Sequence, residues 1–269
     1  MKILVATDLS EAGLLSIQAL IGCNPKLFRG VTLLHVFEVE DYMLGASVPD
    51  AVEWSKKRLA EEAANLVEAG FVADYRLEQG AVPEVVQEVA AETGADLIVV
   101  TDRGEGGAPG RFLGSTATRI AQVDGTPPVL VVRVEERDAT WCRVGEGSPF
   151  VRPLIAADVD QTFERLVRVT AALPGVEATR IVHVVAPDDD ADQARGFMEA
   201  VMERAGLSDA QAVVVEGTDP AADIITESSM WQASLIVLAP RRHGLIGRLV
   251  FGSVAISLLR DSRLPLLFA

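Results

Sequence analysis

Three short polar segments in the first half of the sequence each follow an apolar run and carry groups that can bind a ligand. The first contains Thr7 and Asp8, the second is His35-Val36-Phe37, and the third is Thr101-Asp102-Arg103-Gly104. The carboxylate of Asp8 can accept hydrogen bonds from an adenine amino group or from ribose hydroxyls, but it would repel a phosphate. The first segment therefore suits a nucleoside.

A glycine-rich stretch, residues 105–110, follows the third segment and leads to Gly114-Ser115-Thr116-Ala117-Thr118 and a helical pattern. Glycines let the backbone approach a phosphate, and a helix that begins at Ser115 adds the positive end of its dipole. The hydroxyls of Ser115 and Thr116 can donate hydrogen bonds as well. This composition suits phosphate oxygens, although an ordinary glycine-rich surface loop before a capped helix would share it.

Groups suited to catalysis are few. The sequence has no Gly-x4-Gly-Lys-Ser/Thr loop, and no Gly-x-Ser-x-Gly elbow surrounds Ser115 or Ser253. His35 and His183 stand at equivalent strand ends, where we expect hydrogen-bonded structural imidazoles. Neighbouring acids in residues 188–192 point in different directions, so we expect a solvated loop there. We therefore assign no catalytic residue and no metal site.

Short continuous apolar runs alternate with helical patterns along the chain. Runs such as Ile3-Leu4-Val5-Ala6 are typical of strands buried on both faces of a sheet, and Ser10 and Asp160 are expected to cap the helices that follow. This alternation predicts an open parallel sheet with right-handed crossovers. In such a sheet the ligand crevice lies beyond the carboxyl ends of the strands, where the polar segments stand.

The second half of the sequence repeats the first. The run that ends at Asp8 returns 150 residues later and ends at Asp158, and the two strand-end histidines lie 148 residues apart. The pairs Ala95-Asp96-Leu97-Ile98 with Ala233-Ser234-Leu235-Ile236, and Gly114-Ser115 with Gly252-Ser253, are both offset by 138. The matched segments occur in the same order in both halves, and the number of residues that separates each pair changes only from one element to the next. This pattern indicates a duplication with loops of different length.

The boundary between the halves falls within residues 135–149, where charges, glycines and a proline interrupt the pattern. We predict an α/β protein with two tandem doubly wound, Rossmann-like domains at residues 1–138 and 139–269. Each is expected to hold an open parallel five-stranded sheet flanked by helices.

Composition narrows the function classes. The chain has 269 residues, 49% of them hydrophobic, which is enough for two cores, and its net charge of −15 would repel nucleic acid. No run of about 20 apolar residues could span a bilayer, and no signal peptide opens the sequence. Two cysteines are too few for a disulfide framework. We expect a cytoplasmic protein that binds neither nucleic acid nor membranes.

At these positions the sequence resembles the universal stress protein family. The segment from Lys2 to Ser10 is similar to the family's first strand, which usually ends Asp-Gly-Ser. The family's nucleotide motif is Gly-x2-Gly-x9-Gly-Ser/Thr, and the first half matches it from Thr101 through Gly104 to Gly114-Ser115, with Thr101 replacing one glycine. In the second half the same register gives Ala239 and Arg242 before Gly252, which makes that motif degenerate.

The resemblance implies a site for an adenine nucleotide in the first half: ATP, with AMP or ADP as alternatives, and with Mg²⁺ carried by ATP. It implies adenosine near Asp8 and the backbone of Val36, with ribose and phosphates along the motif. The residues predicted to bind the nucleotide are Thr7, Asp8, Val36, Thr101, Arg103, Gly104, Gly114, Ser115, Thr116 and Ala117. Family members pair through their last strand, here Val129 to Val132, and residues 264–268 could supply that partner as an intramolecular pseudo-dimer with a pseudo-twofold axis. A homodimer is a further option.

The function expected from this resemblance is a stress-response protein that binds ATP in its N-terminal domain and regulates or binds rather than catalyses. A slow ATPase on the same fold is one alternative. A nucleotide-independent interaction module is another, because Thr101 replaces the first glycine of the motif. The cationic residues Arg241, Arg242, His243 and Arg248 could receive a smaller anion in the second half.

Overall fold

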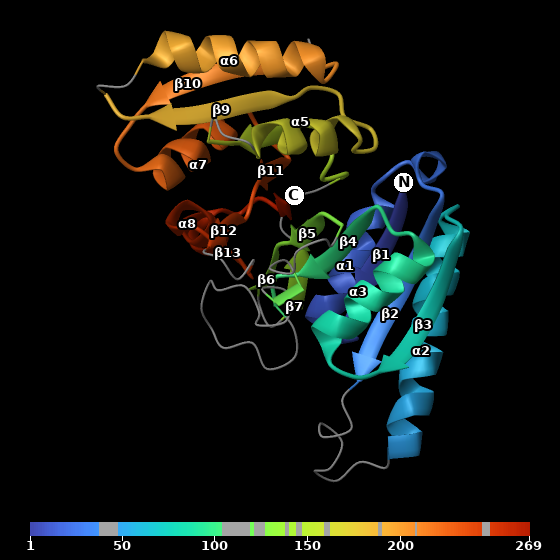
Figure 1. Cartoon of the computed structure of the whole chain (residues 1–269). Coiled ribbons are helices and arrows are strands. Elements are labelled where there is room, and N and C mark those ends of the chain that lie inside the picture. Colours follow the sequence, from blue (N-terminus) through green and yellow to red (C-terminus); the bar gives the residue numbers. More distant parts are fainter. Residues whose placement is uncertain are drawn as a thin grey trace. The chain divides into compact units, whose positions relative to one another are not determined.

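The computed structural model describes residues 1–37, 48–103, 119–120, 127–137, 140–143, 147–158, 162–187, 190–207, 209–243 and 248–269. It divides into two compact units, Met1–Gly147 and Ser148–Ala269. Each unit alternates strands with helices, as the runs of the sequence predict (Figure 1).

The first unit is built on five parallel strands. They are β1 (Lys2–Ala6), β2 (Gly30–Phe37), β3 (Ala73–Gln79), β4 (Leu97–Thr101) and β5 (Val129–Val132), in the spatial order β3-β2-β1-β4-β5. Val5 of the central strand pairs with Leu33 on one side and with Val99 on the other. Residues 3–5 and 97–100 are buried because helices cover both faces of the sheet, which explains why these strands read as continuous apolar runs.

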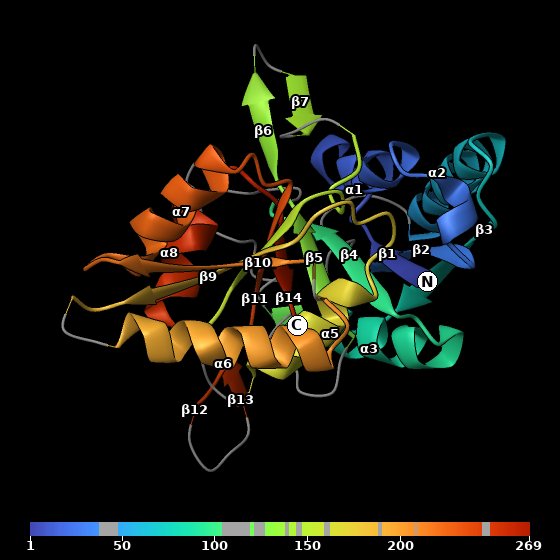
Figure 2. The same ribbon diagram turned by 90° about the horizontal axis from the view of Figure 1, so that it is seen from above.

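Three helices in the described part of the first unit connect strands of this sheet. They are α1 (Glu11–Ile21), α2 (Val48–Glu68) and α3 (Val82–Thr93), and a short 3₁₀ turn, η1 (Pro25–Leu27), precedes β2. Figure 2 shows α1 and α2 on one face of the sheet and α3 on the other, as right-handed crossovers require. After β5 an antiparallel hairpin of β6 (Val134–Arg137) and β7 (Thr140–Arg143) follows.

The second unit has the same topology. Its strands β8 (Pro153–Ala156), β9 (Arg180–Val185), β10 (Gln211–Glu216), β11 (Leu235–Leu238) and β14 (Leu266–Phe268) are parallel, in the order β10-β9-β8-β11-β14. Figure 2 places α5 (Phe163–Ala171) and α6 (Ala191–Arg204) on one face, with α7 (Pro220–Met230) and α8 (Ser253–Asp261) on the other. The predicted fold class, two tandem doubly wound α/β domains, is confirmed. The N-cap position of α5 is Thr162, and Asp160, which was expected to cap this helix, lies outside the described residues.

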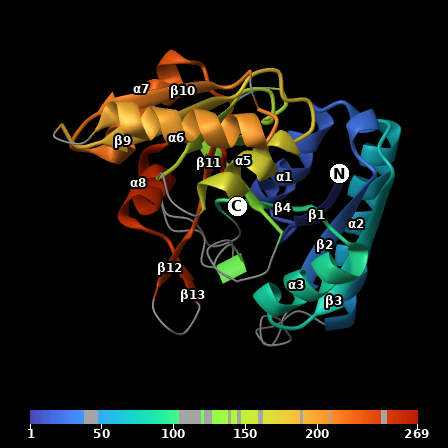
Figure 3. The same ribbon diagram turned by 45° about the horizontal axis from the view of Figure 1, so that its top comes forward.

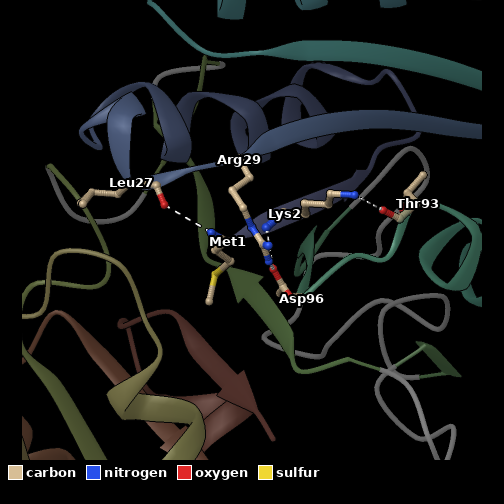
Figure 4. Close-up of polar contacts among 6 residues, drawn as sticks. All are labelled: Met1, Lys2, Leu27, Arg29, Thr93 and Asp96. Carbon is tan, nitrogen blue, oxygen red and sulfur yellow. Dashed lines mark hydrogen bonds and ion pairs between the residues drawn. The ribbon is translucent and has the colours of Figure 1, made fainter.

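Each unit has an equivalent pair of hydrogen bonds at the amino end of its central strand. In the first, the backbone N–H of Lys2 donates to Oδ2 of Asp96 at 2.7 Å, and the Lys2 ammonium donates to the Thr93 carbonyl (Figure 4). In the second, the N–H of Arg152 donates to Oγ of Ser234 at 2.8 Å, and its guanidinium donates to the Trp231 carbonyl. The repeat seen in the sequence is therefore a repeat of contacts as well as of strands.

Asp96 has a further partner in the first unit. The Arg29 guanidinium lies 3.1 Å from its Oδ2, beside the bond from Lys2 (Figure 4). The backbone hydrogen bond from Lys2, together with Arg29, lowers the pKa of Asp96 below its ordinary value despite partial burial. The carboxylate thus fastens the start of β4 to the start of β1.

Among the described residues, no helix combines the length and the apolar character needed to cross a bilayer.

Candidate functional site

The predicted ligand-binding segments of the first unit meet at the carboxyl edge of its sheet. β1 lies between β2 and β4, and Thr7 continues β1 by donating its N–H to the Leu34 carbonyl at 2.9 Å. The chain connects β1 to β2 and β3 on one side, while β4 and β5 lie on the other side. The strand order therefore reverses between β1 and β4, which is where open α/β sheets bind ligands.

Residues 7–10 form a tight turn between β1 and α1, which we call the 7–10 turn. The Leu9 N–H donates to Oγ1 of Thr7 at 3.1 Å. Oδ1 of Asp8 accepts hydrogen bonds from the Ser10 N–H at 3.1 Å and from the Ser10 hydroxyl at 2.6 Å. The turn holds the Asp8 carboxylate at the start of the helix, beside Thr7.

Ser10 also begins α1, because its Oγ accepts a hydrogen bond from the Gly13 N–H at 3.0 Å. This confirms Ser10 as the predicted N-cap. Leu9, between Asp8 and Ser10, has φ of +62°, a left-handed conformation that favours glycine. Leu9 is therefore a buried leucine in a left-handed backbone conformation.

The end of β2 lies over this turn. Nδ1 of His35 is 2.9 Å from the Thr7 carbonyl oxygen, and since a carbonyl only accepts, Nδ1 carries the proton. Nδ1 of His183 makes the same contact to Ala157 in the second unit, at 2.8 Å. Both histidines are structural hydrogen-bond donors, as predicted.

Val36 follows His35 in β2. The Leu34 carbonyl accepts a hydrogen bond from the Thr7 N–H, on the β1 side of β2. The Phe37 carbonyl accepts one from the Gly80 N–H, on the β3 side. Successive residues of a strand address alternate neighbours, so the backbone of Val36 faces the β1 side, beyond the residue at which β1 ends. These backbone groups are available to a ligand at the sheet edge in a way that those of Phe37 are not.

The end of β4 is held by a buried ion pair. Oδ1 of Asp102 accepts a hydrogen bond from the Val134 N–H at 2.9 Å, and its Oδ2 lies 3.2 Å from a guanidinium nitrogen of Arg133. Both side chains are only 6% exposed. Burial raises the pKa of Asp102 above its ordinary value, against the lowering effects of Arg133 and of the Val134 N–H.

Thr101 and Arg103 flank this anchored carboxylate. The Thr101 hydroxyl donates to the Arg103 carbonyl at 2.6 Å, which closes a short turn at the end of β4. Thr101 and Arg103 are half-buried, whereas Asp102 points into the protein. The structure therefore brings Thr7, Asp8, Val36, Thr101 and Arg103 to one edge of the sheet, on three adjacent strands.

The other predicted binding residues, Gly104, Gly114, Ser115, Thr116 and Ala117, lie outside the described residues. Their counterpart in the second unit is described: α8 begins at Ser253, and Gly252 occupies its N-cap position in an extended conformation. In the second repeat the Gly-Ser step therefore stands at the start of a helix.

The degenerate motif of the second unit folds as a hairpin. β12 (Arg241–His243) pairs antiparallel with β13 (Arg248–Val250), so that Arg242 stands opposite Leu249 (Figure 3). Arg242 occupies the motif position at which the first half has Gly104. Paired strand backbone at this point differs from a glycine loop that wraps a phosphate.

Two features of the site were not predicted from the sequence. Gly13 lies directly beneath the Asp8 carboxylate, and its signal would have been a glycine inside a helical pattern three residues after the cap. The partnership of Asp102 with Arg133 had no local signal, because the two residues are neighbours only through the pairing of β4 with β5.

Comparison with known proteins covers both units. The family model of the universal stress protein family matches residues 1–133 and 154–269. A universal stress protein from Archaeoglobus fulgidus DSM 4304 matches over 100% of this chain and 97% of its own, with 23% identity and a TM-score of 0.76. A functionally unknown protein from Pseudomonas aeruginosa PAO1 matches over 99% and 91% of the two chains, with 16% identity and a TM-score of 0.67.

A shorter universal stress protein from Archaeoglobus fulgidus, solved in complex with dAMP, matches over 44% of this chain and 96% of its own, with 22% identity and a TM-score of 0.36. No curated protein matches the chain. The two full-length likenesses show that the whole fold, with its duplicated sheet, recurs in other proteins. Since the family match includes β1 to β5 of the first repeat and β8 to β14 of the second, the chain belongs to the universal stress protein family.

Proposed function

We propose that the first unit binds an adenine nucleotide, ATP in particular, and that the protein responds to the nucleotide as a regulatory or binding protein in a stress response. The observation that carries this proposal is the convergence of the 7–10 turn, the Val36 backbone and the turn after β4 at the point where the strand order reverses. Membership of the universal stress protein family supports the same assignment.

Each end of the proposed site suits a different part of the nucleotide. Asp8 offers acceptors to the adenine amino group or to ribose hydroxyls, and Val36 offers backbone groups. Thr101, Arg103 and Gly104 would follow the ribose and the first phosphate. The terminal phosphates would lie on Gly114, Ser115, Thr116 and Ala117, together with a Mg²⁺ ion carried by ATP. The helix start at Ser253 supports this reading of the Gly-Ser step.

Regulation by nucleotide fits the site better than hydrolysis. His35 uses its Nδ1 proton on the Thr7 carbonyl, and Asp102 uses both carboxylate oxygens on Val134 and Arg133. The Asp102 carboxylate is thus committed to holding the strands rather than to activating a water molecule. We further infer a cytoplasmic protein whose two units form an intramolecular pseudo-dimer, with adenine nucleotide rather than nucleic acid as its partner.

Calorimetric titration of ATP with Mg²⁺ tests this assignment. We expect the wild type to bind one nucleotide per chain. A Gly114→Asp variant places a carboxylate where phosphate is proposed to lie, and we expect it to abolish this binding. Gly252→Asp is the matched control, because it makes the same change at the equivalent position of the second unit. Absence of binding by the wild type, or loss of binding in the control alone, would contradict the proposal.

A further inference from the structure

Gly13 stands at the third position of α1, where glycine is an unfavourable choice. The helix begins after Ser10, so Gly13 lies within its first turn. Glycine lowers helix stability relative to alanine, because it loses more backbone freedom on folding. A locally unfavourable residue beside a binding segment indicates that some other requirement selects it.

The requirement is space for the ligand-binding carboxylate. A Cβ atom at Gly13 would lie 2.1 Å from Oδ1 of Asp8 and 3.2 Å from its Cγ, and 3.0 Å from Oγ1 of Thr7. The 2.1 Å separation is too short for two non-bonded atoms, so any other residue at this position forces Oδ1 of Asp8 to move. Thr7 and Asp8 are the two side chains of the 7–10 turn that are predicted to bind adenosine.

The position of Asp8 is also held by hydrogen bonds that converge on Gly13. Ser10 donates its N–H and its hydroxyl to Oδ1 of Asp8, while its hydroxyl oxygen accepts from the Gly13 N–H. The carboxylate therefore rests on the face of α1 that Gly13 leaves open. A side chain at Gly13 would displace Oδ1 of Asp8, the atom that accepts both bonds from Ser10.

The second unit differs at the same place. The 150-residue offset that relates Asp8 to Asp158 brings Phe163, the first residue of α5, to the Gly13 position. Phe163 is fully buried, and Asp158 is exposed. The open helix face beneath the carboxylate is a property of the unit that carries the better nucleotide motif.

We propose that Gly13 is a positioning residue of the adenosine site, and that its missing side chain fixes Thr7 and Asp8 in the geometry that recognises the nucleoside. This inference rests on the proposed function. It adds a specificity determinant that lies inside a helix, makes no contact with the nucleotide itself, and acts by positioning Asp8 and Thr7.

A Gly13→Ala variant tests the proposal without unfolding the protein, because the atom that must move is the end of a flexible side chain. We expect ATP–Mg²⁺ to bind about tenfold more weakly by calorimetry, as on losing one charge-assisted hydrogen bond. Gly196→Ala is the control for helix propensity, since Gly196 lies in α6 with nothing within 4 Å of its added Cβ. That control should leave the affinity unchanged.

An Asp8→Ala background separates positioning from a general effect on the helix. There the clashing carboxylate is absent and only the 3.0 Å approach to Oγ1 of Thr7 remains, so adding Gly13→Ala should weaken binding less than it does in the wild type. Equal affinity of wild type and Gly13→Ala would overturn this inference alone. A further full loss in the Asp8→Ala background would also overturn it, since Gly13 would then act on the helix as a whole. A wild type that fails to bind ATP would end the proposed function and this inference together.

Discussion

Leu9 occupies a backbone conformation that normally selects glycine, in the turn between β1 and α1. Its φ of +62° is unfavourable for a residue with a Cβ, by about 1–2 kcal/mol. Its side chain is only 4% exposed, and truncating a buried leucine costs about 2–5 kcal/mol. Burial therefore outweighs the strain, which explains how leucine can occupy a left-handed conformation here.

This balance predicts an unusual order of stabilities at position 9. Leu9→Ala loses the stabilisation from the buried side chain and keeps the backbone strain. Leu9→Gly loses the same stabilisation but releases the backbone strain. The relief of about 1–2 kcal/mol exceeds the entropic penalty of glycine, about 0.5–1 kcal/mol. We expect both variants to be less stable than the wild type in urea unfolding, with Leu9→Gly the more stable of the two.

Leu15 provides the matched control, because it is also buried but lies in right-handed helix α1. At Leu15 the alanine variant should be the more stable, by about 1 kcal/mol. The same order at both positions would mean that Leu9 is not strained in solution.

At the scale of elements, β4 is anchored at each end by a carboxylate. Asp96 ties the amino end of β4 to β1, and Asp102 ties its carboxyl end to the residues that follow β5. The buried pair of Asp102 with Arg133 fixes the turn from which the proposed phosphate-binding segment departs. Its role is to hold Thr101 and Arg103 in place.

Breaking this pair from one side leaves a buried charge without its partner. Asp102→Asn and Arg133→Met should each lower the free energy of unfolding by about 3 kcal/mol or more. The double variant removes both charges, so its loss should be smaller than the sum of the single losses by about 1 kcal/mol or more. Strictly additive losses in urea unfolding would show that the two groups do not interact.

The two anchors should respond to pH with opposite signs. The pKa of Asp96 is lowered in the folded protein, so its contribution is complete above the ordinary pKa of about 3.9 and is lost as the pH falls through the folded value. The pKa of Asp102 is raised, so its contribution is greatest below about 3.9 and declines as the pH rises through the folded value.

Urea unfolding of Asp96→Asn and Asp102→Asn between about pH 3 and 7 measures this difference. The stability advantage of the wild type over Asp96→Asn should shrink toward low pH, while its advantage over Asp102→Asn should shrink as the pH rises. Parallel pH profiles for the two variants would contradict the assigned environments.

Other elements show what the sequence could and could not predict. The strands were predictable because residues such as Leu4 and Ile98 lie in continuous apolar runs, and burial on both faces of a parallel sheet produces such runs. The hairpins β6–β7 and β12–β13 were not predicted. Their strands are short and rich in charge, as in Arg241–His243, so no apolar alternation marks them.

The candidate site was predictable to a similar degree. The topology rule placed Thr7, Asp8, Val36, Thr101 and Arg103 at one sheet edge from sequence alone, and the structure has them there. Gly13 and Arg133 were missed, since their roles depend on side-chain geometry and on the pairing of distant strands. Gly104 and residues 114–117 lie outside the described residues, so their role as phosphate ligands stays a prediction.

At the scale of the whole molecule, duplication has produced two units with one topology and different sites. The first unit combines the open face of Gly13 with the better motif, whereas the second has Phe163 and the β12–β13 hairpin at the corresponding positions. From this asymmetry we predict that one nucleotide binds per chain.

Photolabelling with 8-azido-ATP, followed by proteolysis and mass spectrometry, tests the central claim most directly, because it reports which unit holds the nucleotide. Labelling should saturate, be competed by ATP with Mg²⁺, and fall on peptides from residues 1–147. Specific label confined to residues 148–269, or no label that ATP can displace, would contradict the assignment of the nucleotide to the first unit.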